Sequence, residues 1–180
     1  MTLGDFGPRI CVMGPSNSGK STLAQAIARS RNLEPIHLDQ LRHLPNTDWQ
    51  LRPDEEFRKL HDTALLGERW IMDGNYSLLL PQRLRRATGI IQLDVPTTTS
   101  LFRYLRRSWF ERERAGALEG RKDSVKWEMI HHIAMTTHKN RQRYRQMFDR
   151  IDLPKITLLS AREIEGFYHS EGLGDYKSIR

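Results

Sequence analysis

A glycine-rich segment near the N-terminus has residue types and a spacing suited to phosphate chemistry. Residues 14–22 read Gly-Pro-Ser-Asn-Ser-Gly-Lys-Ser-Thr, which satisfies the pattern G-x-x-x-x-G-K-S/T in full. In such a loop the main-chain N–H groups turn inward onto phosphate oxygens, the lysine reaches the β and γ phosphates, and the hydroxyl after it is a ligand for Mg²⁺. The alternative is a chance Gly/Ser-rich turn before a helix. The residues predicted to bind the phosphates of ATP are Gly14, Ser16, Asn17, Ser18, Gly19, Lys20, Ser21 and Thr22. Ser21 is also predicted to be a ligand of the Mg²⁺ ion.

Two aspartates follow short apolar runs further along the chain. Asp39 comes after residues 35–38 and Asp73 after residues 70–72. If both runs are parallel strands, their carboxyl ends meet at the edge that holds the phosphate loop. One carboxylate can then anchor Mg²⁺ while the other orients an acceptor hydroxyl or the metal shell. The alternatives are a turn aspartate before glycine for Asp73 and a helix N-cap for Asp39.

Basic residues dominate the charge balance. Lys plus Arg number 29 against 22 Asp plus Glu, a net charge of +7, and the excess lies mainly between residues 83 and 145. Charge alone fits nucleic acid, an anionic membrane surface or a small polyphosphate ligand. Arg103 and Arg107 lie four residues apart on one helical face, which favours a lid whose arginines close over transferring phosphoryl charge. The alternative is an ordinary solvated helix face.

Short apolar runs alternate with longer helical patterns along the whole chain. This alternation predicts a three-layer α/β fold with right-handed crossovers and a site at the carboxyl ends of the strands. The predicted strands are 9–13, 35–38, 70–72, 89–95 and 155–159, and the predicted helices are 19–29, 53–66, 97–114 and 124–150.

Length and composition set further limits. A chain of 180 residues favours one domain. No apolar stretch approaches the length of about 20 residues that spans a bilayer, and the N-terminal segment lacks the order of a signal peptide. The single cysteine, Cys11, cannot form an internal disulfide. We therefore expect a cytoplasmic protein with no membrane partner.

Four segments together resemble the adenylate-kinase-like P-loop kinases, and within them the DNA topology modulation proteins (the FlaR-like family). The resemblance covers about residues 8–165. It implies a P-loop NTPase fold with a five-stranded parallel sheet, a single domain over residues 1–180 and a helical lid at about 103–124. The segments are residues 14–22, Leu-Asp-Gln-Leu-Arg at 38–42, Trp-Ile-Met-Asp-Gly-Asn-Tyr at 70–76, and Asp-Val-Pro at 94–96 followed by Arg103 and Arg107.

The resemblance also implies roles for single residues. Arg42 would contact the acceptor phosphate, Asp73 would be the acid on the Mg²⁺ side, and Arg103, Arg107 and Arg121 would frame the nucleotide. Two departures limit this transfer. Asp-Gly-Asn-Tyr replaces the Asp-Gly-Phe-Pro-Arg pattern, which argues against AMP as the acceptor. His132 also stands where a further arginine is usual, and Arg141 or Arg145 are the nearest substitutes.

Two hypotheses follow. The first is a kinase that depends on ATP and Mg²⁺, with slow ATPase activity, acting on a nucleoside, nucleotide or similar small molecule. The second is an NTP-binding regulatory or DNA-binding protein whose basic segment contacts backbone phosphates; nucleic acid is thus a secondary partner, and the protein is a monomer or homodimer. In the kinase hypothesis the catalytic residues are Lys20, Asp39, Asp73, Arg103, Arg107 and Arg121, the metal ligands Ser21 and Asp73, and the acceptor-binding residues Arg42, Asn75 and Tyr76.

Overall fold

Five parallel strands form the central sheet in the computed structural model, which describes residues 1–47, 49–110, 137–174 and 176. The strand order is β2-β3-β1-β4-β5, so β1 lies in the middle and the chain moves to opposite sides of it. All four pairings are parallel. The predicted α/β fold with a five-stranded parallel sheet is confirmed. The strands are β1 (Arg9–Met13), β2 (Glu34–His37), β3 (Trp70–Asp73), β4 (Gly89–Leu93) and β5 (Lys155–Leu158).

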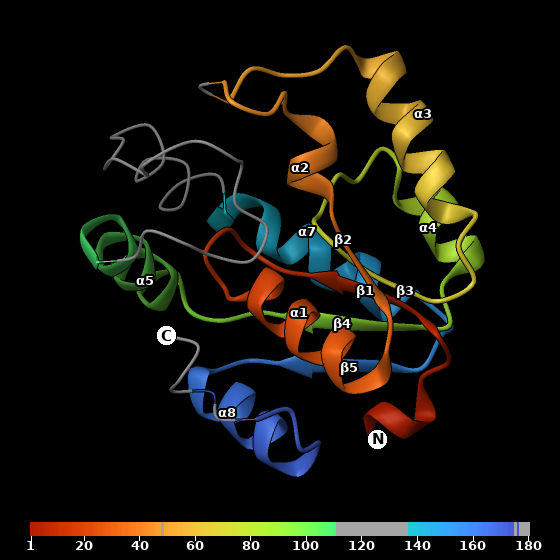
Figure 1. Cartoon of the computed structure of the whole chain (residues 1–180). Coiled ribbons are helices and arrows are strands. Elements are labelled where there is room, and N and C mark those ends of the chain that lie inside the picture. The colour runs from red at the N-terminus through yellow and green to blue at the C-terminus, as the bar shows by residue number, and fades with distance from the viewer. Residues whose placement is uncertain (48, 111–136, 175, 177–180) are drawn as a thin grey trace.

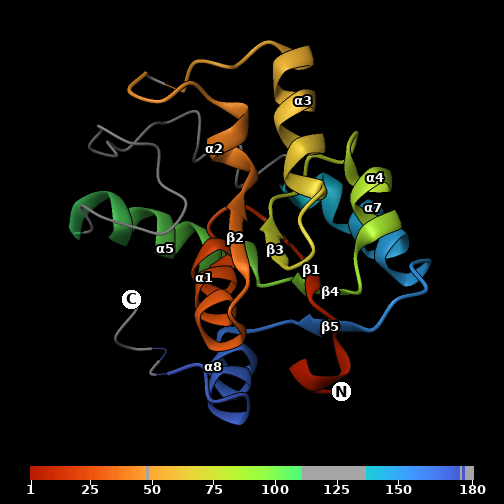
Figure 2. The same ribbon diagram turned by 45° about the vertical axis from the view of Figure 1, so that its right-hand side comes forward.

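The sheet is covered by helices on both faces, because its strands are apolar on both sides. Along β1, Ile10 and Val12 join one buried cluster, while Cys11 and Met13 join the other. The first cluster packs under α1 (Lys20–Arg31) and α8 (Ala161–Ser170). The second packs under α3 (Asp54–Leu65), α4 (Leu80–Arg86) and α7 (Thr137–Asp149). Figures 1 and 2 show these two helical layers on either side of the sheet.

Three short helices were not predicted. The first is α2 (Leu38–Arg42), which follows β2 directly, and the second is α4, only seven residues long with a proline in its first turn. The third is α8, which begins where the Ser160 hydroxyl accepts a hydrogen bond from the main-chain N–H of Glu163. This Ser-x-x-Glu capping pattern was a usable sequence signal.

Two long basic helices were predicted, and the structure describes part of each. The first is α5 (Thr97–Phe110). In the second, α7, Phe148 is buried and Tyr144 packs against the same cluster. Residues 111–136, which include most of the predicted lid, lie outside the described residues. Within the described ranges, no helix is both long and apolar enough to cross a membrane.

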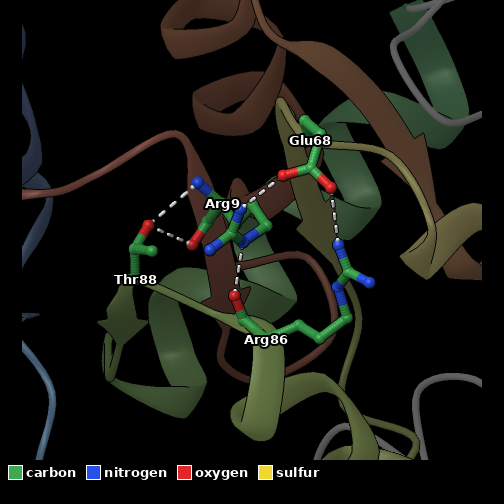
Figure 3. A network of polar contacts seen from close by, with 4 residues as sticks. All are labelled: Arg9, Glu68, Arg86 and Thr88. Carbon is green, nitrogen blue, oxygen red and sulfur yellow. Dashed lines mark hydrogen bonds and ion pairs between the residues drawn. The ribbon is translucent and has the colours of Figure 1, made fainter.

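A polar network ties the sheet together near the amino ends of its strands (Figure 3). Arg9 at the start of β1 donates to Glu68 and to the main-chain oxygen of Arg86. Glu68 also accepts from the Arg86 guanidinium at 3.0 Å, and the Thr88 hydroxyl bonds to the main chain of Arg9. The network lies at the opposite edge from the phosphate loop, so these two arginines have a structural role there.

Candidate active site

The phosphate loop joins β1 to α1, as the sequence predicted, and two of its positions require glycine. Gly14 has φ +147°, and a Cβ atom there would lie 2.3 Å from the main-chain oxygen of Leu93. Gly19 has φ +97° and immediately precedes α1. Side-chain-bearing residues rarely adopt these conformations. The backbone can therefore take this tight path only with glycine at both positions.

Lys20 folds back over its own loop. Its Nζ atom donates a 2.8 Å hydrogen bond to the main-chain oxygen of Pro15. Burial lowers the pKa of Lys20, while the charges of Asp73 and Asp39 act in the opposite direction. The Ser18 hydroxyl is also buried and finds no hydrogen-bond partner within the described part of the chain. A desolvated ammonium and an unused hydroxyl donor beside the loop suit an anionic ligand such as a phosphate chain.

Asp73 ends β3 and is almost fully buried, with both carboxylate oxygens in contact with side chains. Its Oδ2 accepts a 2.6 Å hydrogen bond from the Ser21 hydroxyl. Its Oδ1 lies 2.5 Å from Nδ1 of His37, which the β2–β3 register places directly opposite. The hydroxyl and carboxylate oxygens are the hard ligands that Mg²⁺ prefers, so Ser21 and Asp73 fit the metal they were predicted to hold.

Asp39 lies in the first turn of α2, where its carboxylate faces the cavity described below. The phenol of Tyr76 donates a 2.6 Å hydrogen bond to Oδ1 of Asp39. Burial raises the pKa of Tyr76, and the nearby Asp39 carboxylate raises it further, so the phenol stays a hydrogen-bond donor. The N-cap residue of α2 is His37, and no side chain caps the helix. The alternative role of Asp39 as a cap is therefore not observed.

A cavity of about 390 Å³ lies between the phosphate loop and the residues at the carboxyl ends of β2, β3 and β4. It combines part of the loop, two carboxylates, one amide from β4 and several aromatic rings. The strand ends bring these groups together, as expected for a parallel sheet. The lining residues are Met13, Gly14, Pro15, Ser16, Lys20, Asp39, Gly74, Asn75, Tyr76, Gln92, Leu93, Asp94, Val95, Thr97, Tyr144 and Phe148.

Of the three predicted lid arginines, the structure describes the side chain of one. Arg103 on α5 donates to the main-chain oxygen of Ser18 in the phosphate loop and to the hydroxyl of Tyr176. Its guanidinium also lies over the Tyr176 ring, 6.0 Å from the ring centroid. Arg103 thus converges on the phosphate loop, while the side chain of Arg107 and all of Arg121 lie outside the described part.

Two residues predicted to bind the acceptor have other partners. Arg42 does not line the cavity; it pairs with Asp54 at 2.7 Å and lies over the Phe57 ring, 5.2 Å from its centroid. Asn75 does line the cavity, but its Oδ1 accepts a 3.0 Å hydrogen bond from the main-chain N–H of Gly14. Asn75 therefore supports the phosphate loop from the neighbouring strand end.

Several residues at the site were not predicted. Arg83 is fully buried and donates to the main-chain oxygens of residues 74–76, at 2.8, 2.5 and 3.1 Å. Burial lowers the pKa of Arg83. Asp94 is 2 % exposed at the end of β4 and pairs with Arg145 of α7. A polar residue directly after an apolar strand was the available signal for Asp94.

Comparison with known proteins supports the fold. No protein-family model and no curated protein matches the chain. A gluconokinase from Sinorhizobium meliloti 1021 is 16% identical with a TM-score of 0.55, over 93% of this chain and 95% of that chain. A shikimate kinase from Bacteroides thetaiotaomicron is 20% identical with a TM-score of 0.51, over 90% and 94%. A candidate kinase from Chloroflexus aurantiacus J-10-fl is 14% identical with a TM-score of 0.53, over 97% and 100%.

These neighbours share the fold of the chain. Its five-stranded parallel sheet and helical layers match the fold of the gluconokinase and shikimate kinase structures. At such identities the likeness establishes the fold and no substrate. The resemblance to the DNA topology modulation proteins stays a prediction, since no family model matches.

Proposed function

We propose that the protein is a phosphotransferase that moves the γ-phosphoryl group of ATP to a small-molecule acceptor. The observation that carries this proposal is the cavity, which is lined both by part of the phosphate loop and by the Asp39 carboxylate that follows β2. Lys20 from the loop and Asp39 from the first turn of α2 both line that cavity. The kinase names of the structural neighbours support the same class of reaction.

Each group has a defined task in the proposed reaction. Main-chain N–H groups of the loop and Lys20 hold the β and γ phosphates, and Arg103 adds positive charge beside the loop. Ser21 and Asp73 supply oxygen ligands for Mg²⁺, which when bound neutralises charge on the phosphate oxygens. By the family resemblance, Arg107 and Arg121 also contact the nucleotide.

Asp39 is the proposed base. It accepts the proton of the acceptor hydroxyl while that oxygen forms its bond to the γ-phosphorus. The bond between the γ-phosphorus and the β–γ bridging oxygen breaks, and its electron pair leaves on ADP. Tyr76 holds the Asp39 carboxylate in place from the other side.

An acceptor screen tests this function. ADP release and transfer of labelled γ-phosphate are measured with nucleosides, nucleotides, sugars and hydroxy acids as acceptors. We expect at least one acceptor to raise ADP release above slow hydrolysis, and Lys20→Ala to lower the rate by about 100-fold or more. An unchanged rate in Lys20→Ala, or no stimulation by any acceptor, contradicts the proposed function.

A further inference from the structure

The cavity next to the phosphate loop has a charge distribution that selects among acceptors. Its polar groups outside the loop are carboxylates, amides and hydroxyls. The carboxylates belong to Asp39 and Asp94, the amides to Asn75 and Gln92, and the hydroxyls to Tyr76, Thr97 and Tyr144. Among the described residues, Lys20 is the one cationic side chain that lines it. That lysine belongs to the phosphate loop and serves the donor. Beyond the loop, the described walls therefore offer an acceptor negative and neutral groups.

Two arginines on the neighbouring helices α2 and α4 have other partners. The guanidinium of Arg42 pairs with Asp54 and lies against Phe57, outside the cavity lining. The guanidinium of Arg83 is fully buried and donates to three main-chain oxygens of residues 74–76. Neither guanidinium lines the cavity, so neither can form bidentate hydrogen bonds with a phosphate or carboxylate placed there.

Arg145 does not line the cavity, and it pairs with one of the carboxylates that do. Arg145 donates to Oδ2 of Asp94, and this pair balances its own charge. Asp39 is then the carboxylate that an acceptor meets, since its Oδ1 is held by the Tyr76 hydroxyl and its side chain is exposed to the cavity. An anionic group brought beside it would be repelled, because two negative charges placed close together repel each other.

Aromatic and apolar side chains form much of the rest of the wall. The rings of Tyr76, Tyr144 and Phe148 line the cavity together with Leu93 and Val95. Such surfaces pack against the flat faces of rings, while a few polar groups fix hydroxyls. The carboxylate of Asp39 and the amide of Gln92 can serve as those polar groups.

Resting on the proposed phosphotransferase function, we propose that the acceptor is an uncharged, hydroxyl-bearing ring compound, a sugar either free or within a nucleoside. Phosphorylated and carboxylated compounds are rejected. The acceptor hydroxyl that faces Asp39 gives its proton to that carboxylate and its oxygen to the γ-phosphorus. The products are ADP and a phosphomonoester of the acceptor. The phosphorylated product is therefore negatively charged, whereas the free acceptor is neutral.

Matched pairs of acceptors test this class. Transfer of labelled phosphate from ATP is measured for adenosine and uridine against their 5′-monophosphates, and for glucose and ribose against gluconate and shikimate. We expect kcat/KM for the neutral members to exceed that of the anionic ones by at least about tenfold. Transfer to adenosine or uridine indicates a nucleoside acceptor, and transfer to glucose or ribose indicates a free sugar.

The possible failures are separable. Preference for a monophosphate or an acid, with transfer that still requires Lys20, overturns the acceptor class and leaves the phosphotransferase function standing. Transfer to no compound of either set overturns both. If only the anionic compounds accept phosphate and every neutral compound fails, the proposed acceptor class is wrong.

A binding measurement tests the electrostatic cause directly. Titration calorimetry compares uridine with uridine 5′-monophosphate in the presence of a non-hydrolysable ATP analogue and Mg²⁺. In Asp39→Asn, the preference for uridine should fall by about fivefold or more, because the repelling charge is gone while the side-chain shape is kept. The exposed Asp152→Asn is the matched control and should leave the preference unchanged. An unchanged preference in Asp39→Asn overturns the assigned role of this carboxylate.

Discussion

The Ser21 hydroxyl donates a 2.6 Å hydrogen bond to the Asp73 carboxylate although 52 residues separate them in the chain. Ser21 is the second residue of α1, and Asp73 is the last residue of β3. The pairing of β1 with β3 brings the carboxyl ends of these strands side by side, and the phosphate loop joins β1 to the helix that carries Ser21. The fold thus places two oxygen groups of the kind that Mg²⁺ prefers next to each other.

Asp73→Asn should weaken the metal dependence of the reaction. The amide keeps the size of the side chain but loses the negative charge that attracts Mg²⁺ and orients Ser21. We expect the phosphotransfer rate to fall by about 100-fold or more, with a higher Mg²⁺ concentration needed for half-maximal rate. Initial rates at a series of Mg²⁺ concentrations check this. Asp149→Asn on the exposed end of α7 is the control, and an unshifted Mg²⁺ curve in Asp73→Asn would contradict the assignment.

Asn75→Ala should loosen the phosphate loop. The amide oxygen of Asn75 accepts the N–H of Gly14, which is otherwise left without this partner. We expect a loss of about 1 kcal/mol in the free energy of unfolding and a several-fold weaker affinity for ATP. Urea denaturation and calorimetry with ATP measure the two effects. Leu78→Ala, at an exposed position three residues on, should change neither. Equal behaviour of the two variants would show that the bond does not support the loop.

Much of this site is predictable because strand ends are visible in the sequence. Asp39 and Asp73 stand directly after apolar runs, and the phosphate loop has its own pattern. His37 was missed because its place opposite Asp73 depends on the register of β2 against β3, which no local pattern encodes. Arg83 was missed because arginine on a short helix is normally solvated, and only tertiary packing buries it here.

In the described part of the chain, arginines outside the basic segment of residues 83–145 have structural partners. Several arginines donate to main-chain oxygens within the fold: Arg31 to residues 3 and 6, Arg69 to residues 31 and 32, and Arg52 to residues 41 and 43. Arg103 donates in the same way to the phosphate loop. In the described part of the chain, these guanidinium groups complete local structure or the site. They therefore give the DNA-binding hypothesis no specific support.

Arg83→Met should destabilise the protein and distort the site, whereas Arg86→Met on the same helix should do neither. Arg83 is buried and satisfies three main-chain oxygens of the loop that carries Asn75 and Tyr76. Arg86 instead pairs with the exposed carboxylate of Glu68. We expect Arg83→Met to lower the free energy of unfolding by about 3 kcal/mol, and Arg86→Met to change it by less than about 0.5 kcal/mol.

A conservative variant separates positioning from folding. Arg83→Lys keeps the charge but replaces the rigid fork with one ammonium, so it cannot satisfy all three oxygens equally well. We expect it to fold and to raise KM for the acceptor more than it lowers kcat, because the loop still binds the donor. Steady-state kinetics with both substrates measure this split. Wild-type kinetics in folded Arg83→Lys would limit the role of Arg83 to stability.

Cys11 should make the stability of the protein depend on pH in the alkaline range. Burial raises the pKa of the Cys11 thiol from 9.0 to about 11, and the nearby Arg83 charge opposes this in part. Above pH 9 the unfolded chain loses the thiol proton while the folded chain retains it, so the unfolded state gains stability as pH rises. We expect wild type to lose about 2 kcal/mol more than Cys11→Ala between pH 8 and pH 10.5. The variant removes this titration, so the constant cost of its cavity cancels in the comparison. Urea denaturation at the two pH values gives the difference, and parallel pH profiles for the two proteins would contradict the buried thiol as its source.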